Sequence, residues 1–204
     1  MTFDIILVTW NRRLYTQATV ASLISSGAYR DCERFIIVDN HSTEDGMMDF
    51  LDDMAHMKKV FIVRRPQNDG WGMAVNDVLG LSRAQYLFVS NNDVDYDLGF
   101  HQKMFKSFEE HPDIGILAVW HHTAHGAPTN AVNDEYFHEW DNVPAIGWMM
   151  PKKAMEKCGF LEENGPCFEK GGNGEDTSYA IKMKSWGYLV GTPATDVGHH
   201  RDGY

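Results

Sequence analysis

The sequence predicts an α/β fold with a mostly parallel central sheet and helices on both faces. Short apolar segments recur through the first 120 residues, and segments with helical character separate them. The apolar segments do not alternate with polar residues, which indicates strands that are buried on both faces of a sheet. Polar clusters directly follow three of these segments. Such clusters gather at the carboxyl edge of a parallel sheet, where ligands bind.

The first half of the chain contains four predicted strands and the helices that connect them. The strands are short apolar runs at residues 3–8, 34–39, 59–63 and 85–90. The helices are predicted at residues 12–26, 42–57 and 72–82. Gly27 is expected to end the first helix, and Ser42 or Thr43 to cap the second. The three polar clusters are Thr9-Trp10-Asn11, Asp39-Asn40 and Asn91-Asn92-Asp93.

The second half of the chain begins with the same alternation and then changes character. Residues 120–144 are rich in histidine, asparagine, aspartate and aromatic residues, with weak periodicity. We predict a long loop with one short strand there, and loops of this length are usually functional. The other elements are predicted as a helix at 98–110, strands at 114–119 and 145–150, and helices at 151–159 and 175–187.

Composition excludes several classes of protein. The 204 residues, of which 43% are hydrophobic, suffice for one domain with a substantial core. The net charge of −11 opposes binding to a phosphate backbone, so no nucleic-acid partner is expected. No apolar run approaches the ~20 residues of a transmembrane helix, and the N-terminus lacks the basic region of a signal peptide. With three cysteines and no CxxC pair, the chain is expected to be cytoplasmic.

The segment YLFVSNNDVDYD ends a predicted strand with three carboxylates at alternate positions, Asp93, Asp95 and Asp97. Carboxylates this close repel one another, so they either face water or surround a cation. A calcium EF-hand loop is excluded, because its sixth and twelfth positions would be Leu98 and Met104 rather than glycine and glutamate. A haloacid dehalogenase-type phosphatase is disfavoured, because its D-x-D ends the first strand and this one follows the fourth.

Two explanations of this acidic segment remain. One is a solvated acidic turn, as any aspartate-rich loop can form. The other is a site for a divalent metal ion that binds a nucleotide sugar. Carboxylate oxygens bind Mg²⁺ or Mn²⁺ and leave coordination positions open for diphosphate oxygens. The metal ion would stabilise the diphosphate as a leaving group, and the rest of the sequence favours this second explanation.

Seven segments that cover most of the chain carry further information. In order, they are ILVTWNR, IIVDNHSTEDG, NDGWGMAVN, FVSNNDVD, AIGWMMPKKAMEKCGFLEE, GEDTSYAIKMKSWGY and PATDVGH. They resemble the successive motifs of family 2 glycosyltransferases of GT-A fold, and the likeness is greatest to the rhamnosyltransferase-like branch. The resemblance implies a Rossmann-like GT-A domain over residues 1–204, with a nucleotide-sugar-binding half at 1–97 and an acceptor-binding and catalytic half at 98–204.

The resemblance implies a set of residues that bind the donor nucleotide. Asp39 would contact a pyrimidine base, and Gly70 would let the backbone approach the ligand closely. The full set is Thr9, Asn11, Asp39, Asn68, Gly70, Asn76 and Asn91.

The resemblance also implies a metal site for Mn²⁺ or Mg²⁺. Asp93 matches the second acid of the family's D-x-D motif, with Asn91 in place of the first acid. Asp93 and Asp95 together form a literal D-x-D, so Asp95 is the second expected ligand. His199 matches a histidine that completes such sites, and the adjacent His200 is the competing candidate.

Glu175 and Asp176 match the family's acidic pair. An inverting transferase needs a base that takes the proton from the acceptor hydroxyl, and Asp176 is preferred over Glu175 for that role. The alternative is that an acidic pair at a helix start simply interacts with the helix dipole. Trp140 and Trp148 flank the expected acceptor side and are candidates for stacking on a sugar.

Together these features predict an inverting glycosyltransferase, of hexosyl or rhamnosyl type, that depends on a divalent metal ion. It would move a sugar from a UDP- or dTDP-linked donor to a hydroxyl group of a glycan or another acceptor. The alternative is a non-catalytic relative that binds nucleotide sugars or glycans, since Asn91 replaces the first acid. A nucleotidyltransferase is disfavoured because its glycine-rich N-terminal loop is absent. The HHTAH segment, His121 to His125, has no counterpart in the family.

Overall fold

The computed structural model describes residues 1–120, 131–159, 161 and 174–201. The strands are β1 (Phe3–Thr9), β2 (Arg34–Asp39), β3 (Val60–Arg64), β4 (Tyr86–Ser90), β5 (Val94–Tyr96), β6 (Ile114–Ala118), β7 (Phe137–Glu139), β8 (Gly147–Pro151), β9 (Leu189–Pro193) and β10 (Gly198–His200). The helices are α1 (Arg13–Ser25), α2 (Ala28–Asp31), α3 (Met47–Ala55), α4 (Trp71–Leu79), α5 (Phe100–Glu110), α6 (Lys152–Cys158) and α7 (Gly174–Ser185). None of the helices in these ranges is long and apolar enough to cross a membrane.

Within the described ranges, eight strands form one central sheet in the order β3-β2-β1-β4-β8-β6-β9-β7, and β10 and β5 form a separate ribbon. The strands β3, β2, β1 and β4 are parallel, as the buried apolar runs predict. The second half is mixed, because β8 lies antiparallel between β4 and β6 and β7 lies antiparallel to β9. The first four strands therefore end at one edge of the sheet.

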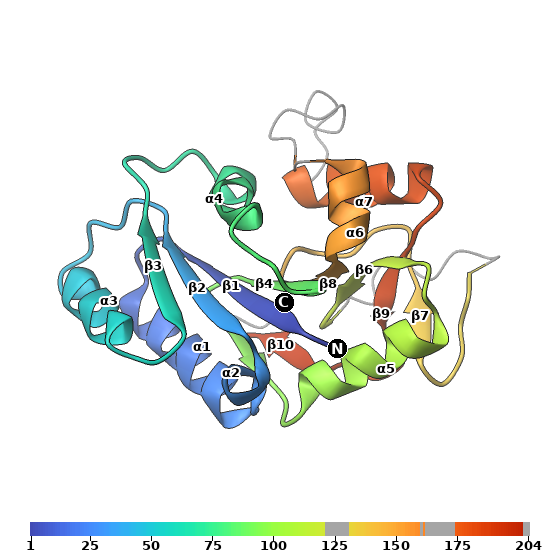
Figure 1. The fold of residues 1–204 in the computed structure, drawn as a ribbon, viewed down its shortest axis with the longest axis horizontal. Coiled ribbons are helices and arrows are strands. Elements are labelled where there is room, and N and C mark those ends of the chain that lie inside the picture. Colours follow the sequence, from blue (N-terminus) through green and yellow to red (C-terminus); the bar gives the residue numbers. More distant parts are fainter. Residues whose placement is uncertain (121–130, 160, 162–173, 202–204) are drawn as a thin grey trace.

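Helices cover both faces of the sheet, and the side chains of β1 alternate between them. Phe3, Ile5 and Leu7 belong to the core beneath α1, α2, α3 and α5, whereas Ile6 and Val8 belong to the core beneath α4, α6 and α7. Figure 1 shows these two helical layers on opposite sides of the strands. All five of these side chains are at most 6% exposed, and burial of each stabilises the fold by about 1.5–3 kcal/mol.

The prediction that a helix begins near residue 42 is wrong, because α3 begins only after Gly46, which has a φ of 74°. Ser42 does not cap the helix; its hydroxyl accepts a hydrogen bond from the backbone N–H of Asn11 at 2.7 Å. The side-chain oxygen of Asn11 in turn accepts from the backbone N–H groups of Thr43 and Glu44, at 2.8 and 3.0 Å. These bonds hold residues 42–44 as a turn against the β1–α1 loop, because short polar side chains compete with helix formation.

The acidic segment after β4 continues into the short strand β5, which pairs antiparallel with β10. The hydroxyl of Thr19 in α1 accepts from the backbone N–H of Val94 at 3.1 Å and donates to its carbonyl at 3.0 Å. This helix thereby fixes the chain beside Asp93. Neither β5, β9 nor β10 was predicted, whereas β7 is the short strand expected after residue 120. The histidines at 121–125 lie outside the described residues.

Candidate functional site

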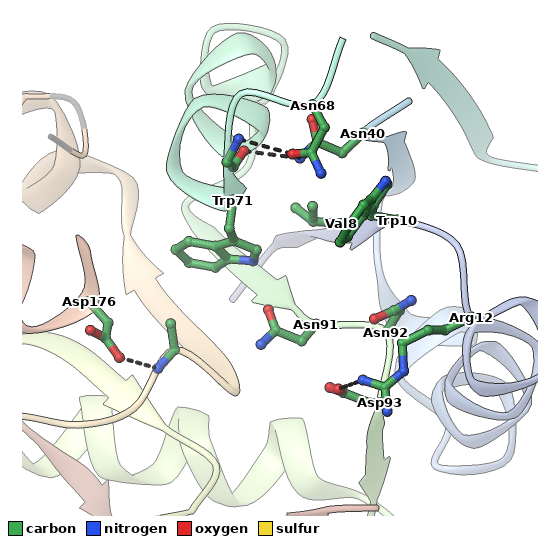
Figure 2. Close-up of a pocket in the computed structure, with 12 residues that line it drawn as sticks. Val8, Trp10, Arg12, Asn40, Asn68, Trp71, Asn91, Asn92, Asp93 and Asp176 are labelled. Carbon is green, nitrogen blue, oxygen red and sulfur yellow. Dashed lines mark hydrogen bonds and ion pairs between the residues drawn. The ribbon is translucent and has the colours of Figure 1, made fainter. Parts of the chain in front are cut away.

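A cavity of about 650 Å³ opens at the carboxyl edge of the parallel strands. Most of its lining residues follow the end of a strand or lie at the start of a helix, which is where ligands bind in sheets of this type. Trp10 and Arg12 follow β1, Asn40 follows β2, and Asp93 follows β4. Figure 2 shows these side chains around the cavity, with Asp176 on the side opposite Arg12 and Asp93.

The wall formed by the β3–α4 connection is held by a network of amide side chains. The side-chain N–H₂ of Asn40 donates to the side-chain oxygen of Asn68 at 2.7 Å and to the carbonyl of Gly70 at 3.1 Å. Arg65, which is 8% exposed, donates to the Asn40 side chain and to Asp77, each at 2.7 Å. The network fixes the turn before α4, where Gly70 adopts a φ of 97° that only glycine adopts readily.

The N-terminus of α4 lines the cavity through Gly70 and Trp71. The first N–H groups of a helix carry a partial positive charge and favour an anion. The buried indole N–H of Trp71 has no hydrogen-bond partner among the described residues. This wall is suited to phosphate oxygens or other acceptors.

Asp93 forms the opposite, anionic wall and is only 7% exposed. Its Oδ2 atom lies 2.8 Å from Nη1 of Arg12 and 3.2 Å from Nε2 of His200. Its Oδ1 atom is buried and has no hydrogen-bond partner within the described ranges. A buried carboxylate oxygen without a partner is destabilising unless a ligand satisfies it.

The two candidate histidines lie on opposite faces of the β5–β10 ribbon, because successive side chains of a strand alternate. His199 pairs with Asp95 across the ribbon, with 3.8 Å between Nε2 of His199 and Oδ2 of Asp95. The His199 side chain is 64% exposed, and Arg201 also forms an ion pair with Asp95. His200, the competing candidate, is therefore the histidine beside Asp93, and Asp95 and His199 form a separate group.

Asp93 and the neighbouring His200 carry donor atoms suited to a divalent cation. No three His, Cys, Asp or Glu side chains cluster as a ready-made metal site in the described part of the chain. Asp93 and His200 nevertheless supply a carboxylate and an imidazole, and the buried side-chain oxygen of Asn91 in the same cavity has no partner among the described residues. A carboxylate with an amide oxygen and an imidazole fits Mn²⁺ or Mg²⁺ when phosphate oxygens complete the coordination.

Asp176 enters the cavity from the first turn of α7. Its Oδ1 atom accepts a hydrogen bond from the backbone N–H of Thr177 at 2.7 Å, and its Oδ2 atom accepts from that of Ala145 at 3.4 Å. Two backbone donors thus orient the carboxylate. The side chain of Glu175 lies outside the described part of the chain.

Four of the predicted donor-binding residues hold elements around the cavity and do not line it. The hydroxyl of Thr9 lies 2.8 Å from that of Thr16, and Asn11 braces the turn at 42–44. Asp39 is 2% exposed and accepts from the backbone N–H of Ser42 at 3.1 Å. The fourth, Asn76, exchanges two hydrogen bonds with the backbone of residue 161. Asp39 lies next to the cavity, since the following residue lines it.

The tryptophans expected on the acceptor side are packed into the protein. Trp148 is 0% exposed, packs edge-on against Trp71 and donates its indole N–H to the carbonyl of Pro144 at 2.8 Å. The indole of Trp140 donates to Thr192 at 3.1 Å. Burial leaves Trp148 without a ring face for a sugar. Trp10, which is 54% exposed and lines the cavity, has a ring in position to stack on a ligand.

The sequence alone had assigned no functional role to Trp10, Arg12 or Asn40. The signal for Trp10 and Asn40 was their position in the polar clusters directly after predicted strands. The position of Arg12 was harder to predict, because its backbone adopts a left-handed conformation, with a φ of 55°, that its residue type does not indicate.

The comparisons with known proteins agree with this fold. A profile described as Glycosyl transferase family 2 matches residues 4–167. No curated protein matches the sequence. Among solved structures, GalNAc-T7 with UDP, GalNAc and Mn²⁺ is similar, with a TM-score of 0.76 and 11% identity over 98% of this chain and 43% of that one.

Two further solved structures are similar over most of this chain. The mannosyltransferase PcManGT from Pyrobaculum calidifontis, in complex with GDP-Man and Mn²⁺, has a TM-score of 0.74 and 15% identity over 96% of this chain and 55% of that one. TarS 1–349 of S. aureus, in complex with UDP-GlcNAc, has a TM-score of 0.68 and 14% identity over 96% of this chain and 56% of that one. The chain thus spans about half the length of these proteins. The likeness confirms the GT-A fold predicted from the sequence.

Proposed function

This chain belongs to glycosyl transferase family 2, and from that premise we propose that its cavity binds a nucleotide-diphosphate sugar and transfers the sugar to an acceptor hydroxyl. The proposed donor is UDP- or dTDP-linked, and the proposed outcome is inversion at the anomeric carbon. One observation carries the proposal: the cavity has Asp93 on one side and Asp176 on the opposite side. The first suits a cation that binds diphosphate, and the second suits a base near the acceptor.

The proposed diphosphate position lies between Asp93 and the N-terminus of α4. The helix N-terminus and the indole N–H of Trp71 supply donors to phosphate oxygens there. Asp93, His200 and Asn91 would hold a divalent ion, Mn²⁺ or Mg²⁺, which supplies positive charge to the leaving diphosphate. Similar structures contain Mn²⁺ together with UDP or GDP-Man, which supports this assignment.

Asp176 is the proposed general base. Its carboxylate takes the proton from the acceptor hydroxyl as the hydroxyl oxygen forms its bond to the anomeric carbon. In the same displacement, the bond between that carbon and the diphosphate oxygen breaks, and the electron pair stays with the diphosphate. The backbone N–H groups of Thr177 and Ala145 orient the carboxylate for this transfer.

The proposed base pocket combines Trp10 with Asp39. The exposed ring of Trp10 offers a stacking surface for a flat base. Asp39 beside it would accept a hydrogen bond from N3–H of uracil or thymine. One such bond suffices for about tenfold selectivity, which corresponds to ~1.4 kcal/mol. Guanine can also donate to a carboxylate, through N1–H and N2–H, so the expected preference for UDP- and dTDP-sugars over GDP-sugars rests on the family resemblance.

A donor screen that measures release of the nucleotide diphosphate tests this function. With the best donor, we expect Asp176→Asn to lower turnover by ~10²–10⁴-fold, because it removes proton acceptance but keeps the size of the side chain. The dissociation constant for UDP, measured by calorimetry, should stay unchanged. Asp141→Asn is the matched control, since Asp141 is a nearby acid with an 81% exposed side chain.

Three other outcomes would change the assignment. A Glu175→Gln variant that loses turnover while Asp176→Asn keeps it would move the base to Glu175. Donor binding without release of diphosphate, from any donor or acceptor, would favour the non-catalytic binding protein. A protein that binds none of the donors would contradict both functions.

A further inference from the structure

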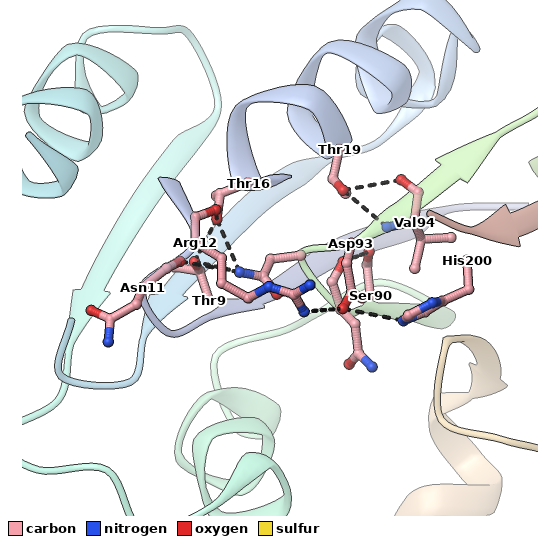
Figure 3. A network of polar contacts seen from close by, with 11 residues as sticks. Thr9, Asn11, Arg12, Thr16, Thr19, Ser90, Asp93, Val94 and His200 are labelled. Atoms are coloured by element: carbon pink, nitrogen blue, oxygen red, sulfur yellow. Dashed lines mark hydrogen bonds and ion pairs between the residues drawn. The ribbon is translucent and has the colours of Figure 1, made fainter. Parts of the chain in front are cut away.

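Arg12 is the cationic side chain paired with Asp93 at the cavity. Its Nη1 atom lies 2.8 Å from Oδ2 of Asp93, the same oxygen that lies 3.2 Å from Nε2 of His200. Figure 3 shows the Asp93 carboxylate between the Arg12 guanidinium and the His200 ring. A divalent ion that used this oxygen would meet the guanidinium at short distance, and two cations repel one another.

The backbone directs Arg12 into the cavity. Asn11 and Arg12 both adopt left-handed conformations, with φ values of 52° and 55°, which are uncommon for residues other than glycine. The backbone N–H of Asn11 donates to Ser42, and its side-chain oxygen accepts from the backbone N–H groups of residues 43 and 44; these bonds keep the loop in this shape. The loop therefore fixes the Arg12 backbone near Asp93, in a conformation that a free chain would rarely adopt.

The two partners of this ion pair differ in their freedom to move. The Asp93 side chain is 10% exposed and enclosed, whereas the Arg12 side chain is 42% exposed at the cavity. The Arg12 guanidinium also lies 4.2 Å from the ring centre of Tyr15, a contact that a modest rotation would change. A guanidinium binds phosphate oxygens in a bidentate manner, and the proposed diphosphate position shares the cavity with Arg12.

We propose that Arg12 is a mobile counter-ion that neutralises Asp93 while the donor site is empty and moves onto the diphosphate when donor and metal ion bind. This inference rests on the proposed function, because it requires a nucleotide diphosphate in the cavity. Without donor, Arg12 competes with the metal ion for Asp93. With donor, Arg12 leaves the carboxylate to the metal ion and contacts the phosphate oxygens.

The proposal requires that the metal ion and the nucleotide strengthen each other's binding through Arg12. Nucleotide draws Arg12 away from Asp93 and so raises the metal affinity, and by linkage the metal ion raises the nucleotide affinity by the same factor. If Arg12 only held Asp93 in place, its removal would have the opposite effect on metal affinity. In that case, removal of the guanidinium would let the carboxylate rotate away and would weaken metal binding.

Mn²⁺ binding, followed by electron paramagnetic resonance of the free ion, separates these two roles without any measurement of turnover. For Arg12→Gln without nucleotide, we expect Mn²⁺ affinity to rise by about tenfold, the effect of one charged competitor. For the same variant with Mn²⁺ present, we expect UDP affinity, measured by calorimetry, to fall by about tenfold. Arg13→Gln is the matched control, because it removes the same charge from the next residue, which does not line the cavity.

Each outcome decides between the alternatives. Weaker or unchanged Mn²⁺ affinity in Arg12→Gln would overturn this proposal. The proposed function would still stand in that case, provided that the wild type binds UDP. An equal rise in Mn²⁺ affinity in Arg13→Gln would also overturn it, since a general change in net charge would then explain the effect. In an Asp93→Asn background, the Arg12 substitution should no longer change the Mn²⁺ affinity. A change that persists would place the metal ion away from Asp93 and contradict the proposal. A wild type that binds UDP but never Mn²⁺ would remove both this proposal and the metal site.

Discussion

At the scale of single residues, the position of one carboxylate organises the cavity. Asp93 follows β4 directly, and Thr19 fixes the backbone of the next residue through two hydrogen bonds. The carboxylate therefore stays enclosed between Arg12 and His200. Enclosure makes its charge effective, because water and salt screen a buried pair less than an exposed one.

Asp31 provides a test of electrostatics away from the cavity. The pKa of the Asp31 carboxyl is lowered to about 2, mainly by hydrogen bonds from Arg30. A hydrogen bond between Nε2 of His101 and Oδ2 of Asp31, at 3.0 Å, also lowers this pKa. Because this pKa is lower in the folded protein than in the unfolded chain, the carboxylate stabilises the fold above pH ~4. That contribution is lost as pH falls from ~4 towards 2.

We expect Asp31→Asn to lower the free energy of unfolding by about 0.5–1 kcal/mol at pH 6, a small value because the pair is partly exposed. The difference from wild type should shrink as pH falls towards 2. Urea unfolding at pH 6, 4 and 2.5 measures it, with Asp52→Asn as a control in an exposed ion pair on another helix. A difference that grows on acidification would contradict this assignment.

The family resemblance pointed to Asp93 and Asp176, which both line the cavity, and it preferred His199 to His200, the histidine that lies beside Asp93. Residue type and spacing place both acids at the ends of predicted elements. The choice between His199 and His200 depends on the register of β10 against β5, which puts His199 opposite Asp95. A shift of one residue in that pairing would exchange their faces, and no local signal in the sequence fixes it. The direction of Arg12 likewise depends on backbone angles that its residue type does not favour.

At the scale of elements, β9 connects the mixed half of the sheet because it lies between β6 and β7. Gly191 sits at the centre of this strand, opposite Leu117 on one side and Glu139 on the other. A side chain at this position would overlap the backbone carbonyl of His138 and the ring of Phe137. The close approach of β7 therefore requires glycine here.

We expect Gly191→Ala to lower the free energy of unfolding by about 1–3 kcal/mol or more, the usual cost of overpacking. Gly80→Ala is the control, because a methyl group there meets nothing within 4 Å and the backbone is already helical. That variant should be neutral or slightly more stable. Equal stability of Gly191→Ala and wild type in urea would show that β7 does not pack against β9 as described.

The strands that sequence reasoning found are those whose own residues specify them. The strands β1, β2, β3 and β4 are each five to seven residues of mostly apolar sequence, so local pattern suffices. The strands β5 and β10 have three residues each and carry histidine and aspartate. They form only because distant parts of the chain pair, and such pairing is decided by tertiary contacts.

At the scale of the whole molecule, one sheet supports both sides of the proposed reaction. The strands β1, β2 and β4 end at the donor side of the cavity, and α7, next to the mixed half of the sheet, contributes Asp176. The separation between Asp93 and Asp176 is therefore set by elements that pack on one central sheet. The family resemblance predicted the GT-A fold, whereas the pattern of strands and helices alone predicted an α/β fold with polar clusters at one edge of its sheet.

The central claim is that the cavity binds a nucleotide diphosphate together with a divalent ion on Asp93. Calorimetric titration of UDP into the protein, with Mn²⁺ and then with EDTA, tests it most directly. We expect at least about tenfold tighter binding with Mn²⁺, or ~1.4 kcal/mol, and we expect Asp93→Asn to lose that difference while Asp97→Asn keeps it. Equal affinity for UDP with Mn²⁺ and with EDTA, or an Asp93→Asn variant that responds to Mn²⁺ as the wild type does, would contradict the claim.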